Sequence, residues 1–383
     1  KSFKNYSIVT QVISKGWRLI LKLYPYLIWT LLIRLDGFKK IGFVKFGIDE
    51  RAAMTQKYRA VIIGAGKIAV GYDNKHSSKV LTHVHALMLQ DHIHCAGVFD
   101  VNKLALQDVV KKWGVKTYDT FDSLMSVAPD LVVIAVPDEL HEKYLNLVLP
   151  YKPKIVICEK PLTLNYESSR VIVQRYNDSG IPLVVNFQRR FDSAVLSLKK
   201  RLEDNDLGRP LGGALWYSKG IIHNGSHAID LFSFLFGDVY EYSVRDRVFD
   251  YHPSDPTVGG TIKFRDIAIE LIPGDERLFS LFEIDLLFEK GRFRFRHSGL
   301  KYEIFKVEPD PVFEGYSELI SSGIKDTGLK NAMSLLYSQV FDFLNSNREF
   351  PYEAVGSLKT QHVAEQMAKT SCGGVYIYEQ TKG

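Results

Sequence analysis

Two glycines, Gly64 and Gly66, lie directly after an apolar run at 60–63, with Ala65 between them. Gly64 permits a tight turn from a strand into a helix, and Gly66 lacks the side chain that would keep a phosphate away from the backbone. The spacing therefore favours binding of a dinucleotide, whose pyrophosphate would meet the start of the following helix. Because glycine turns also close ordinary strand–helix connections, the interpretation depends on residues further along the chain.

A carboxylate follows the next apolar run and indicates which dinucleotide is preferred. Residues 92–99 read as a second strand, and Asp100 comes directly after them. From this position a carboxylate can accept hydrogen bonds from ribose hydroxyls, so Asp100 favours NAD over NADP. Its distance from the glycine turn exceeds the usual spacing of about 20 residues, which we attribute to an inserted loop at 71–83. The alternative is a solvated carboxylate that starts a turn at 100–102.

The composition predicts a globular protein. The chain has 383 residues, of which 46% are hydrophobic and 24% charged, and it is long enough for two domains with substantial cores. Its three cysteines, Cys95, Cys158 and Cys372, are widely spaced and form no CxxC pair. The sequence therefore predicts neither a disulfide framework nor a zinc site, and we expect a cytoplasmic protein.

The positive charge of the chain is concentrated in residues 1–53. They hold ten Lys or Arg and three Asp or Glu, a net charge of +7, which leaves −2 for the remainder of a chain with +5 in total. Nucleic-acid binding is not expected, because phosphate affinity depends on positive charge. Within this leader, Lys22 and Pro25 interrupt an apolar segment at 17–33. Its uncharged run is too short to cross a bilayer, which takes about 20 residues.

Three interpretations of this leader remain open. It could lie in the membrane interface as an anchor with basic flanks, or dock onto a partner. It could also be an extension foreign to the working protein, because the chain does not begin with Met. Met54 lies just ahead of the first strand and would make a normal start.

From residue 59 onward, apolar runs alternate with helical stretches. This alternation predicts an α/β fold, a doubly wound parallel sheet of the Rossmann type, assigned to residues 54–178. The expected strands are 60–63, 96–99, 131–136 and 155–158, with a further strand at 183–186, and the expected helices are 104–113, 139–149 and 166–177.

The pattern changes after 208–210, where segments of period two begin. Such alternation predicts a large, mostly antiparallel open sheet with one buried face, so residues 179–383 form an α+β domain. Phe and Arg alternate at 292–296, which fits a strand with one apolar and one solvated face, or a subunit interface. The other expected strands are 261–264, 267–272 and 279–287, and the expected helices are 331–344 and 357–368.

Four further motifs follow the glycine turn. They are Ala135-Val136-Pro137-Asp138 with His141, Glu159-Lys160-Pro161, the run Asn186-Phe187-Gln188-Arg189-Arg190-Phe191, and the run from His223 to Asp230. Each is weak alone, but all five in this order and spacing resemble the Gfo/Idh/MocA oxidoreductase family over residues 58–371. The resemblance implies a Rossmann domain followed by an α/β domain whose open sheet often makes the subunit interface.

The resemblance also implies which residues hold the ligands. Lys160 and His227 would be catalytic. NAD, with NADP second, would be held by Gly64, Gly66, Lys67, Ile68, Asp100, Pro137, His141, Glu159 and Lys160. The substrate would be held by Arg189, Arg190, His223, Asn224 and Asp230.

These residue types suit the oxidation of a secondary alcohol. The reaction needs a base for the hydroxyl proton and a cation that stabilises the developing alkoxide. Lys160 can supply either, and the positive nicotinamide ring would lower its pKa toward neutrality. His227 titrates near neutral pH and is the second candidate for proton transfer. The alternative for Lys160 is an exposed surface lysine after a strand.

The chain departs from the family pattern at His223, where many members carry an aspartate. An Asp–His pair with His227 is therefore not expected. On a helix the two histidines would share a face, but no nearby carboxylate or cysteine completes a ligand set, so no metal site is predicted. Instead, His223 and Asn224 would bind substrate hydroxyls, and Asp230 would orient the helix or a substrate group.

Arg189 and Arg190 leave two interpretations open. Their planar donors could bind a carboxylate, a phosphate or a sugar hydroxyl, or they could form an ion pair that holds the domains together.

The sequence therefore predicts an NAD(P)-dependent oxidoreductase that interconverts a secondary alcohol and a ketone on a sugar, cyclitol or nucleotide sugar. We expect it to be a homo-oligomer. One alternative is a redox-neutral glycosidase or lyase that uses NAD transiently, because it begins with the same hydride transfer. The other is a non-catalytic NAD-binding regulator, against which the retention of Lys160 and His227 argues.

Overall fold

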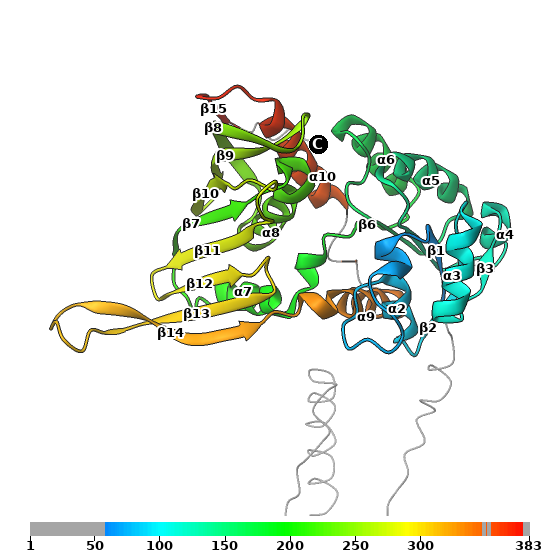
Figure 1. The fold of residues 1–383 in the computed structure, drawn as a ribbon, viewed down its shortest axis with the longest axis horizontal. Helices are drawn as coiled ribbons and strands as arrows, with labels where there is room; N and C mark the ends of the chain where they lie inside the picture. The colour runs from blue at the N-terminus through cyan, green and yellow to red at the C-terminus, as the bar shows by residue number, and fades with distance from the viewer. Residues whose placement is uncertain (1–57, 347–349, 351–353, 378–383) are drawn as a thin grey trace, which may run out of the picture. The chain divides into compact units, whose positions relative to one another are not determined.

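The computed structural model describes residues 58–346, 350 and 354–377. In this part of the chain, the first sheet has six parallel strands in the order β3-β2-β1-β4-β5-β6. The apolar runs of the sequence form these strands because a parallel sheet is buried on both faces. The strands, of which β1, β2, β3 and β6 are labelled in Figure 1, are β1 Tyr58–Ile63, β2 Ile93–Phe99, β3 Thr117–Tyr118, β4 Leu131–Ile134, β5 Ile155–Cys158 and β6 Leu183–Val185.

Helices cover both faces of this sheet, as a doubly wound fold requires. Ala60 and Ile62 of β1 pack in the cluster that includes residues of α2, α3 and α9, whereas Val61 and Ile63 pack in the cluster that includes α4, α5 and α6. The helices are α2 His83–Met88, α3 Lys103–Trp113, α4 Phe121–Met125, α5 His141–Val148, α6 Tyr166–Asp178 and α9 Ala332–Asn345.

Two features of this domain extend past residue 178, where a boundary was expected. β6 pairs with β5 as the last strand of the sheet. Helix α9 comes from much later in the chain, yet its apolar face belongs to the same core as β1. The chain therefore returns to the first domain after building the second.

The segment after the glycine turn differs from the expected helix. Only the five residues of η1, Lys67–Gly71, are helical, with π-type geometry, and a loop then runs to α2. This loop confirms the insertion expected at 71–83. Asp73 holds it in place, because its carboxylate accepts bonds from the Leu81 amide and the Thr82 hydroxyl.

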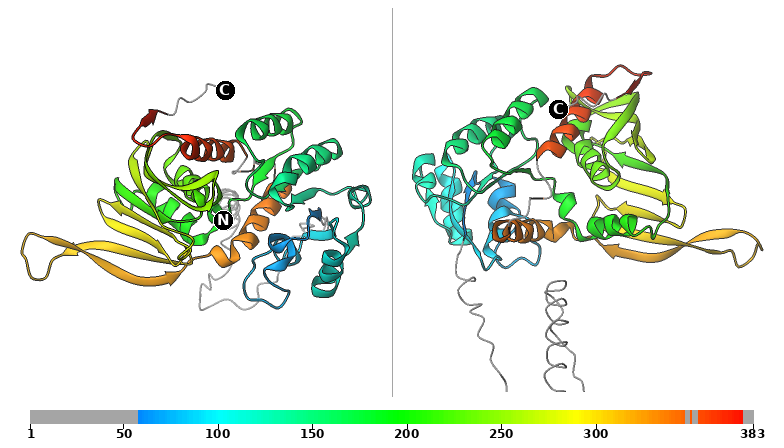
Figure 2. Two further views of the ribbon diagram at one scale, coloured as in Figure 1. Left: turned by 45° about the horizontal axis from the view of Figure 1, so that its top comes forward. Right: turned by 180° about the vertical axis from the view of Figure 1, so that it is seen from behind.

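The second sheet of the described chain has nine strands in the order β14-β13-β12-β11-β7-β10-β9-β8-β15. Every neighbouring pair is antiparallel except β7 and β10, which confirms a large, mostly antiparallel sheet. The β13–β14 hairpin projects beyond the other strands (Figure 2). The strands are β7 Pro210–Tyr217, β8 Val239–His252, β9 Asp255–Phe264, β10 Ile267–Pro273, β11 Phe282–Phe288, β12 Gly291–Arg296, β13 Lys301–Pro309, β14 Ser317–Asp326 and β15 Val375–Ile377.

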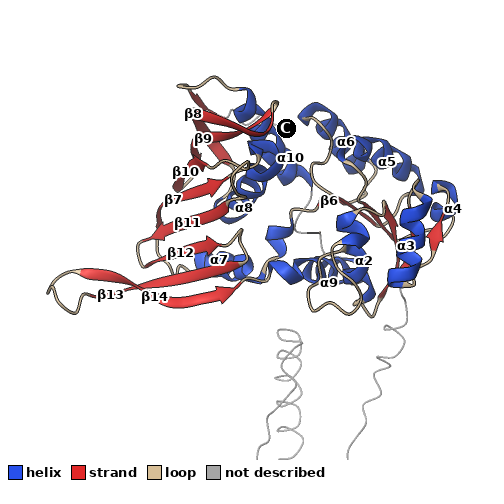
Figure 3. Cartoon of the chain, in the orientation of Figure 1, coloured by secondary structure: helices blue, strands red, loops and turns tan. Residues whose placement is uncertain are grey.

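One face of this sheet packs against α7 Ser193–Glu203, α8 Ser226–Phe236 and α10 Ala354–Lys369 (Figure 3). Phe293 and Phe295 of β12 lie in that core. On the other face, Arg292 and Arg294 form ion pairs with Asp285. The Phe and Arg alternation therefore marks the two faces of a strand, as predicted.

The leader at 1–53, with the interpretations proposed for it, lies outside the described residues. Within the described part of the chain, no helix is both long enough and apolar enough to span a membrane.

Candidate active site

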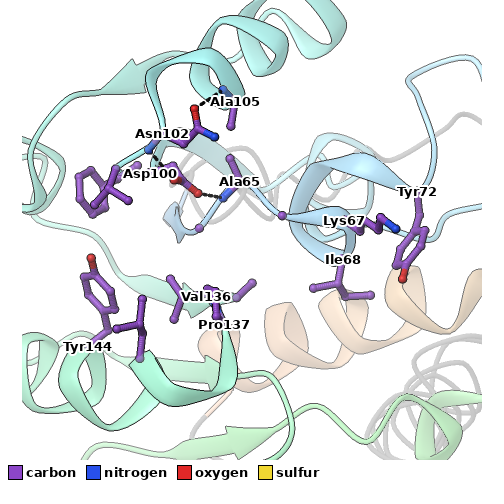
Figure 4. A pocket seen from close by; sticks show the side chains of 16 residues that line it. Ala65, Lys67, Ile68, Tyr72, Asp100, Asn102, Ala105, Val136, Pro137 and Tyr144 are labelled. Carbon is purple, nitrogen blue, oxygen red and sulfur yellow. Dashed lines mark hydrogen bonds between the residues drawn. The ribbon is translucent and has the colours of Figure 1, made fainter. Parts of the chain in front are cut away.

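A cavity of about 480 Å³ opens at the carboxyl ends of β1, β2 and β4 (Figure 4). The strand order reverses between β1 and β4, and open α/β sheets bind their ligands at such a switch point. The cavity is lined by six predicted cofactor-binding residues, Gly64, Gly66, Lys67, Ile68, Asp100 and Pro137, together with Ala65, Tyr72, Phe99, Val101, Asn102, Ala105, Ala135, Val136, Leu140 and Tyr144.

Glycine suits each of the two positions in the turn for a different structural reason. Gly64 has a φ of +105°, and a Cβ placed there would lie 2.4 Å from the carbonyl oxygen of Ala135. Only glycine fits that position. At Gly66 the nearest atom to an added Cβ would be the same oxygen at 3.9 Å, so the missing side chain leaves open space. The turn therefore offers bare backbone to the cavity, which fits a pyrophosphate.

Asp100 connects the second strand to the glycine turn. Its Oδ2 accepts a hydrogen bond of 2.7 Å from the Ala65 amide, and its Oδ1 accepts one of 2.8 Å from the Asn102 amide. The carboxylate thus starts a turn at 100–102, as the alternative interpretation predicted, and it also lines the cavity. Each carboxylate oxygen can accept a further bond, which a ribose hydroxyl could supply.

The apolar wall of the cavity includes residues that the sequence did not reveal, among them Tyr72, Leu140 and Tyr144. The Tyr144 ring packs 6.2 Å from that of Phe99, centre to centre. Burial, and then the charge of Asp100, raise the pKa of its hydroxyl. The signal available in the sequence was that a helix begins soon after Pro137. The first turn of such a helix, here α5, must lie beside the ends of the strands.

His141 lies within the protein rather than on the cavity wall. Its side chain is fully buried, with Nδ1 2.6 Å from the carbonyl oxygen of Pro161 and Nε2 3.0 Å from that of Val136. It therefore connects the loop after β4 to the loop after β5. This position differs from the predicted contact with the nicotinamide.

Glu159 belongs to a buried polar network. Its Oε1 lies 2.9 Å from His83 Nε2 and accepts a bond of 2.6 Å from the Asn186 amide. The other ring nitrogen of His83 lies 2.7 Å from the Tyr337 hydroxyl. Burial raises the pKa of Glu159, but bonding and charge from His83, then Asn186 and Lys160, outweigh it and lower the pKa. The carboxylate therefore stays ionised.

Lys160 follows Glu159 and is partly buried. Its Nζ donates a hydrogen bond of 3.1 Å to the carbonyl oxygen of His223. Burial lowers its pKa from 10.5, and the charges of Glu159 and Asp138 oppose that change without cancelling it. The pKa of Lys160 is thus lowered by burial, and the predicted effect of the nicotinamide ring stays a prediction.

His227 is expected to stay neutral at physiological pH. Burial, followed by the charges of Lys160 and Arg189, lowers its pKa well below 6.5. Its Nδ1 is buried and has no hydrogen-bond partner among the described residues. The prediction that His227 titrates near neutrality therefore fails, because it did not include the cost of burying the charged form.

The two histidines lie on different helical segments. His223 belongs to η5, Gly220–Gly225, of π-type geometry, and His227 belongs to α8. The His223 ring packs 4.8 Å from that of Tyr251, and burial lowers its pKa to about 4. The two segments follow each other without a break, and the helical geometry changes from π to α between the two histidines.

Asp255 was missed in the sequence and shapes η5. Its two oxygens accept the amides of Ile222 at 2.7 Å and His223 at 2.9 Å. The Asn224 amide nitrogen donates a bond of 2.9 Å to the carbonyl of Ser218. Asn224, predicted to bind substrate, therefore has at least its amide nitrogen committed to the fold.

Arg190 and Asp230 pair with each other. Arg190 Nε donates a bond of 2.7 Å to Asp230 Oδ2, a second bond joins Nη2 to Oδ1, and both residues are buried. The structure thus favours the ion-pair interpretation of Arg190, and neither residue is available to a substrate. Arg189 is different, because its Nη2 donates to the Ser298 carbonyl, at 3.4 Å, and it has no carboxylate partner in the described part of the chain.

Comparison with known proteins agrees with this geometry. Residues 58–187 match the family described as "Oxidoreductase family, NAD-binding Rossmann fold". This part of the chain is similar to the Gfo/Idh/MocA oxidoreductases, in agreement with the resemblance of the sequence motifs. The match covers the Rossmann domain, including β6, and ends at the start of the second domain.

Curated relatives include sugar and cyclitol dehydrogenases. An inositol 2-dehydrogenase of Mycolicibacterium gilvum is 36% identical over 132 residues, which are 31% of this chain and 38% of that protein. A glucose-6-phosphate 3-dehydrogenase of Bacillus subtilis is 24% identical over 258 residues, 67% of this chain and 63% of that protein. The chain thus spans less than half of the inositol 2-dehydrogenase it matches.

Solved structures share the fold of both domains. The WlbA dehydrogenase from Bordetella pertussis, in complex with NADH and UDP-GlcNAcA, has a TM-score of 0.66 at 18% identity and covers 85% of this chain and 99% of its own. An oxidoreductase from Agrobacterium radiobacter, in complex with NAD+, L-tartaric acid and magnesium, also has a TM-score of 0.66 at 18% identity, covering 84% and 98%. At this identity the likeness concerns the fold alone.

Proposed function

We propose that this protein is an NAD-dependent oxidoreductase that interconverts a secondary alcohol and a ketone on a sugar, cyclitol or nucleotide sugar. The observation that carries the proposal is the position of Lys160 relative to the cofactor cavity. His141 bridges Val136, which lines the cavity, to Pro161, the neighbour of Lys160. The backbone next to Lys160 is thereby tied to the strand end where the cavity opens.

The cavity fits NAD better than NADP. The bare backbone of Gly64 and Gly66 accommodates a pyrophosphate, and Asp100 places a carboxylate where the adenosine ribose would lie. A 2′-phosphate at that ribose would bring a second negative charge against Asp100. The relatives named as inositol and glucose-6-phosphate dehydrogenases support a polyhydroxylated substrate.

The side chains around Lys160 can move the proton that alcohol oxidation releases. Bound NAD supplies the acceptor for the hydride that leaves the carbinol carbon. Lys160 Nζ, once uncharged, takes the proton from the substrate hydroxyl, and the lowered pKa makes the uncharged amine accessible. The neutral His227 offers a ring nitrogen as an acceptor beside it. The reverse reaction returns the same proton from Nζ to the ketone oxygen.

Glu159 and its partners would keep Lys160 in place. The Glu159 carboxylate is fixed by His83 and Asn186. The backbone of the adjacent residue, Lys160, is therefore held in place. The negative charge of Glu159 also stabilises the ammonium group that forms on Lys160 after proton transfer.

Formation of NADH tests the proposal. The full chain is mixed with NAD or NADP and a panel of free sugars, inositols, sugar acids, sugar phosphates and nucleotide sugars, and nicotinamide absorbance is followed. We expect NADH to accumulate with one substrate class and NAD to be preferred. Release of free sugar without NADH would support the redox-neutral alternative. Cofactor binding without any conversion would support the regulator.

A further inference from the structure

Arg189 is a cation held at a fixed place beside the candidate active site. It belongs to η4, Gln188–Phe191, directly after the sixth strand. The guanidinium carbon lies 3.8 Å from the centre of the Phe282 ring, and Nη2 donates to the Ser298 carbonyl. Burial lowers the pKa of this group to about 10, which still leaves it charged at neutral pH.

No carboxylate neutralises this charge within the described chain. Among the described residues, no Asp or Glu oxygen lies within 4.0 Å of the Arg189 nitrogens, whereas the neighbouring Arg190 pairs with Asp230. The carboxylate of Asp192, whose charge acts on Arg189, already accepts the amides of Ala194 and Gly328, at 2.8 Å each. Arg189 is half-buried, and a cation that is partly removed from water without a carboxylate partner favours an anionic ligand at this position.

A strained turn holds the guanidinium. His297, Ser298 and Gly299 have φ values of +53°, +58° and +79°. The left-handed conformation is unfavourable for residues other than glycine. A Cβ at position 299 would lie 2.3 Å from Nη1 of Arg189, so only glycine permits this approach. Such strain is typical of sites that must place a side chain accurately.

Arg189 lies near the proposed catalytic pair. Its charge and that of Lys160 both act on His227, whose ring packs 5.6 Å from that of Phe187. Two other charged groups that act on Lys160, Asp255 and Lys219, already have partners. Asp255 accepts two backbone amides, and Lys219 lies 3.8 Å from Glu276.

We propose that Arg189 binds a negatively charged group of the substrate, a carboxylate or a phosphate, while Lys160 and His227 act on a hydroxyl of the same molecule. The planar guanidinium offers a two-pronged set of donors that matches either oxyanion, and the charge becomes paired only when the substrate is bound. A neutral sugar would leave Arg189 unpaired. The substrate class is therefore an acidic or phosphorylated sugar or cyclitol, an inference that rests on the function proposed above.

Matched substrates test this inference. NADH formation is measured with D-glucose, D-glucuronate and glucose 6-phosphate, and with the corresponding charged and neutral forms of whichever sugar the enzyme prefers. We expect kcat/KM to favour a charged form by more than about tenfold, because leaving a charged donor unpaired is costly. The better of the carboxylate and the phosphate identifies the oxyanion.

Variants of Arg189 test whether this residue causes the preference for a charged substrate. Arg189→Gln should raise KM for the charged substrate by more than about tenfold with a smaller change in kcat, and should abolish the preference over the neutral form. Arg189→Lys should keep part of this preference, because the positive charge remains but the planar pair of guanidinium donors is lost. Arg209→Gln, which removes an exposed ion pair with Glu289, is the matched control and should behave as the wild type.

The outcomes separate this inference from the proposed function. Equal kcat/KM for charged and neutral forms, with no effect of Arg189→Gln, would overturn the inference and leave the dehydrogenase intact. If the panel yields no NADH, calorimetry tests the inference instead. It measures the binding of glucuronate and glucose 6-phosphate to the wild type and to Arg189→Gln. Binding that requires Arg189 supports the inference without the redox reaction, and absence of binding overturns it.

Discussion

Burial determines the state of both groups proposed for proton transfer. Removal from water disfavours the charged form, so the pKa values of Lys160 and His227 are both lowered. Sequence motifs were sufficient to select these two residues. They did not reveal that His227 would stay neutral, because its environment is built by Phe187, Lys160 and Arg189, which are distant in sequence.

The pH dependence of stability follows from the same burial. His223 has a pKa of about 4 in the folded protein and 6.5 as its ordinary value. Below pH 6.5 the unfolded chain binds a proton that the folded chain does not, so the free energy of unfolding falls as the pH drops toward 4. His223→Asn should flatten this fall, as measured by urea unfolding at a series of pH values. Identical slopes would contradict the lowered pKa.

The pair formed by Arg190 and Asp230 should support stability rather than substrate binding. Arg190→Met leaves the buried Asp230 carboxylate without a partner, and breaking such a pair costs about 3–5 kcal/mol. Unfolding by denaturant measures this loss. The double variant Arg190→Met/Asp230→Leu should recover part of it, because no charge remains buried. A loss below about 1 kcal/mol for Arg190→Met would contradict this account.

At the level of elements, the strands of the first sheet were predicted well because each is a short apolar run between helices. β5 matches its predicted bounds, Ile155–Cys158. By contrast, β8 was not foreseen, since its pairing with β9 shifts register at three places and its pattern does not alternate cleanly. The short η1 was also unforeseen, because the loop after it is anchored by Asp73 rather than by a continuing helix.

The glycine turn should respond differently to alanine at its two positions. Gly64→Ala forces a Cβ against Ala135 in a backbone conformation that L-residues avoid, so both stability and NADH affinity should fall. Gly66→Ala has space and should fold normally, but its methyl group would face the pyrophosphate and weaken NADH binding. Thermal unfolding and NADH fluorescence separate the two effects. Equal destabilisation would refute this distinction.

Across the whole molecule, the site combines segments that a linear pattern could not connect. The Tyr337 hydroxyl on α9 is hydrogen-bonded to His83 on α2, and His83 is hydrogen-bonded to Glu159 after β5. The sequence marked Glu159 through its motif and α9 through its periodicity. It contained no signal that α9 would return to the first domain, because an apolar helical face does not specify its partner.

This network should affect turnover more than cofactor binding. His83→Leu removes the partner of Glu159, so the carboxylate and the adjacent Lys160 would lose their fixed positions. We expect kcat to fall by about 10- to 100-fold, with NADH affinity nearly unchanged. His83→Gln should restore part of the rate through an amide donor. If both variants lose NADH affinity and keep kcat, the network instead supports the cofactor cavity.

The most direct test of the central claim compares Lys160→Ala with the wild-type chain. NADH affinity is measured by fluorescence and substrate-dependent NADH formation by absorbance, on the same preparations. We predict that the variant binds NADH within a few fold of the wild type but loses turnover by more than about a hundredfold, because proton transfer by a positioned side chain contributes that much. Unchanged turnover in Lys160→Ala would remove Lys160 from the reaction and contradict the proposed site.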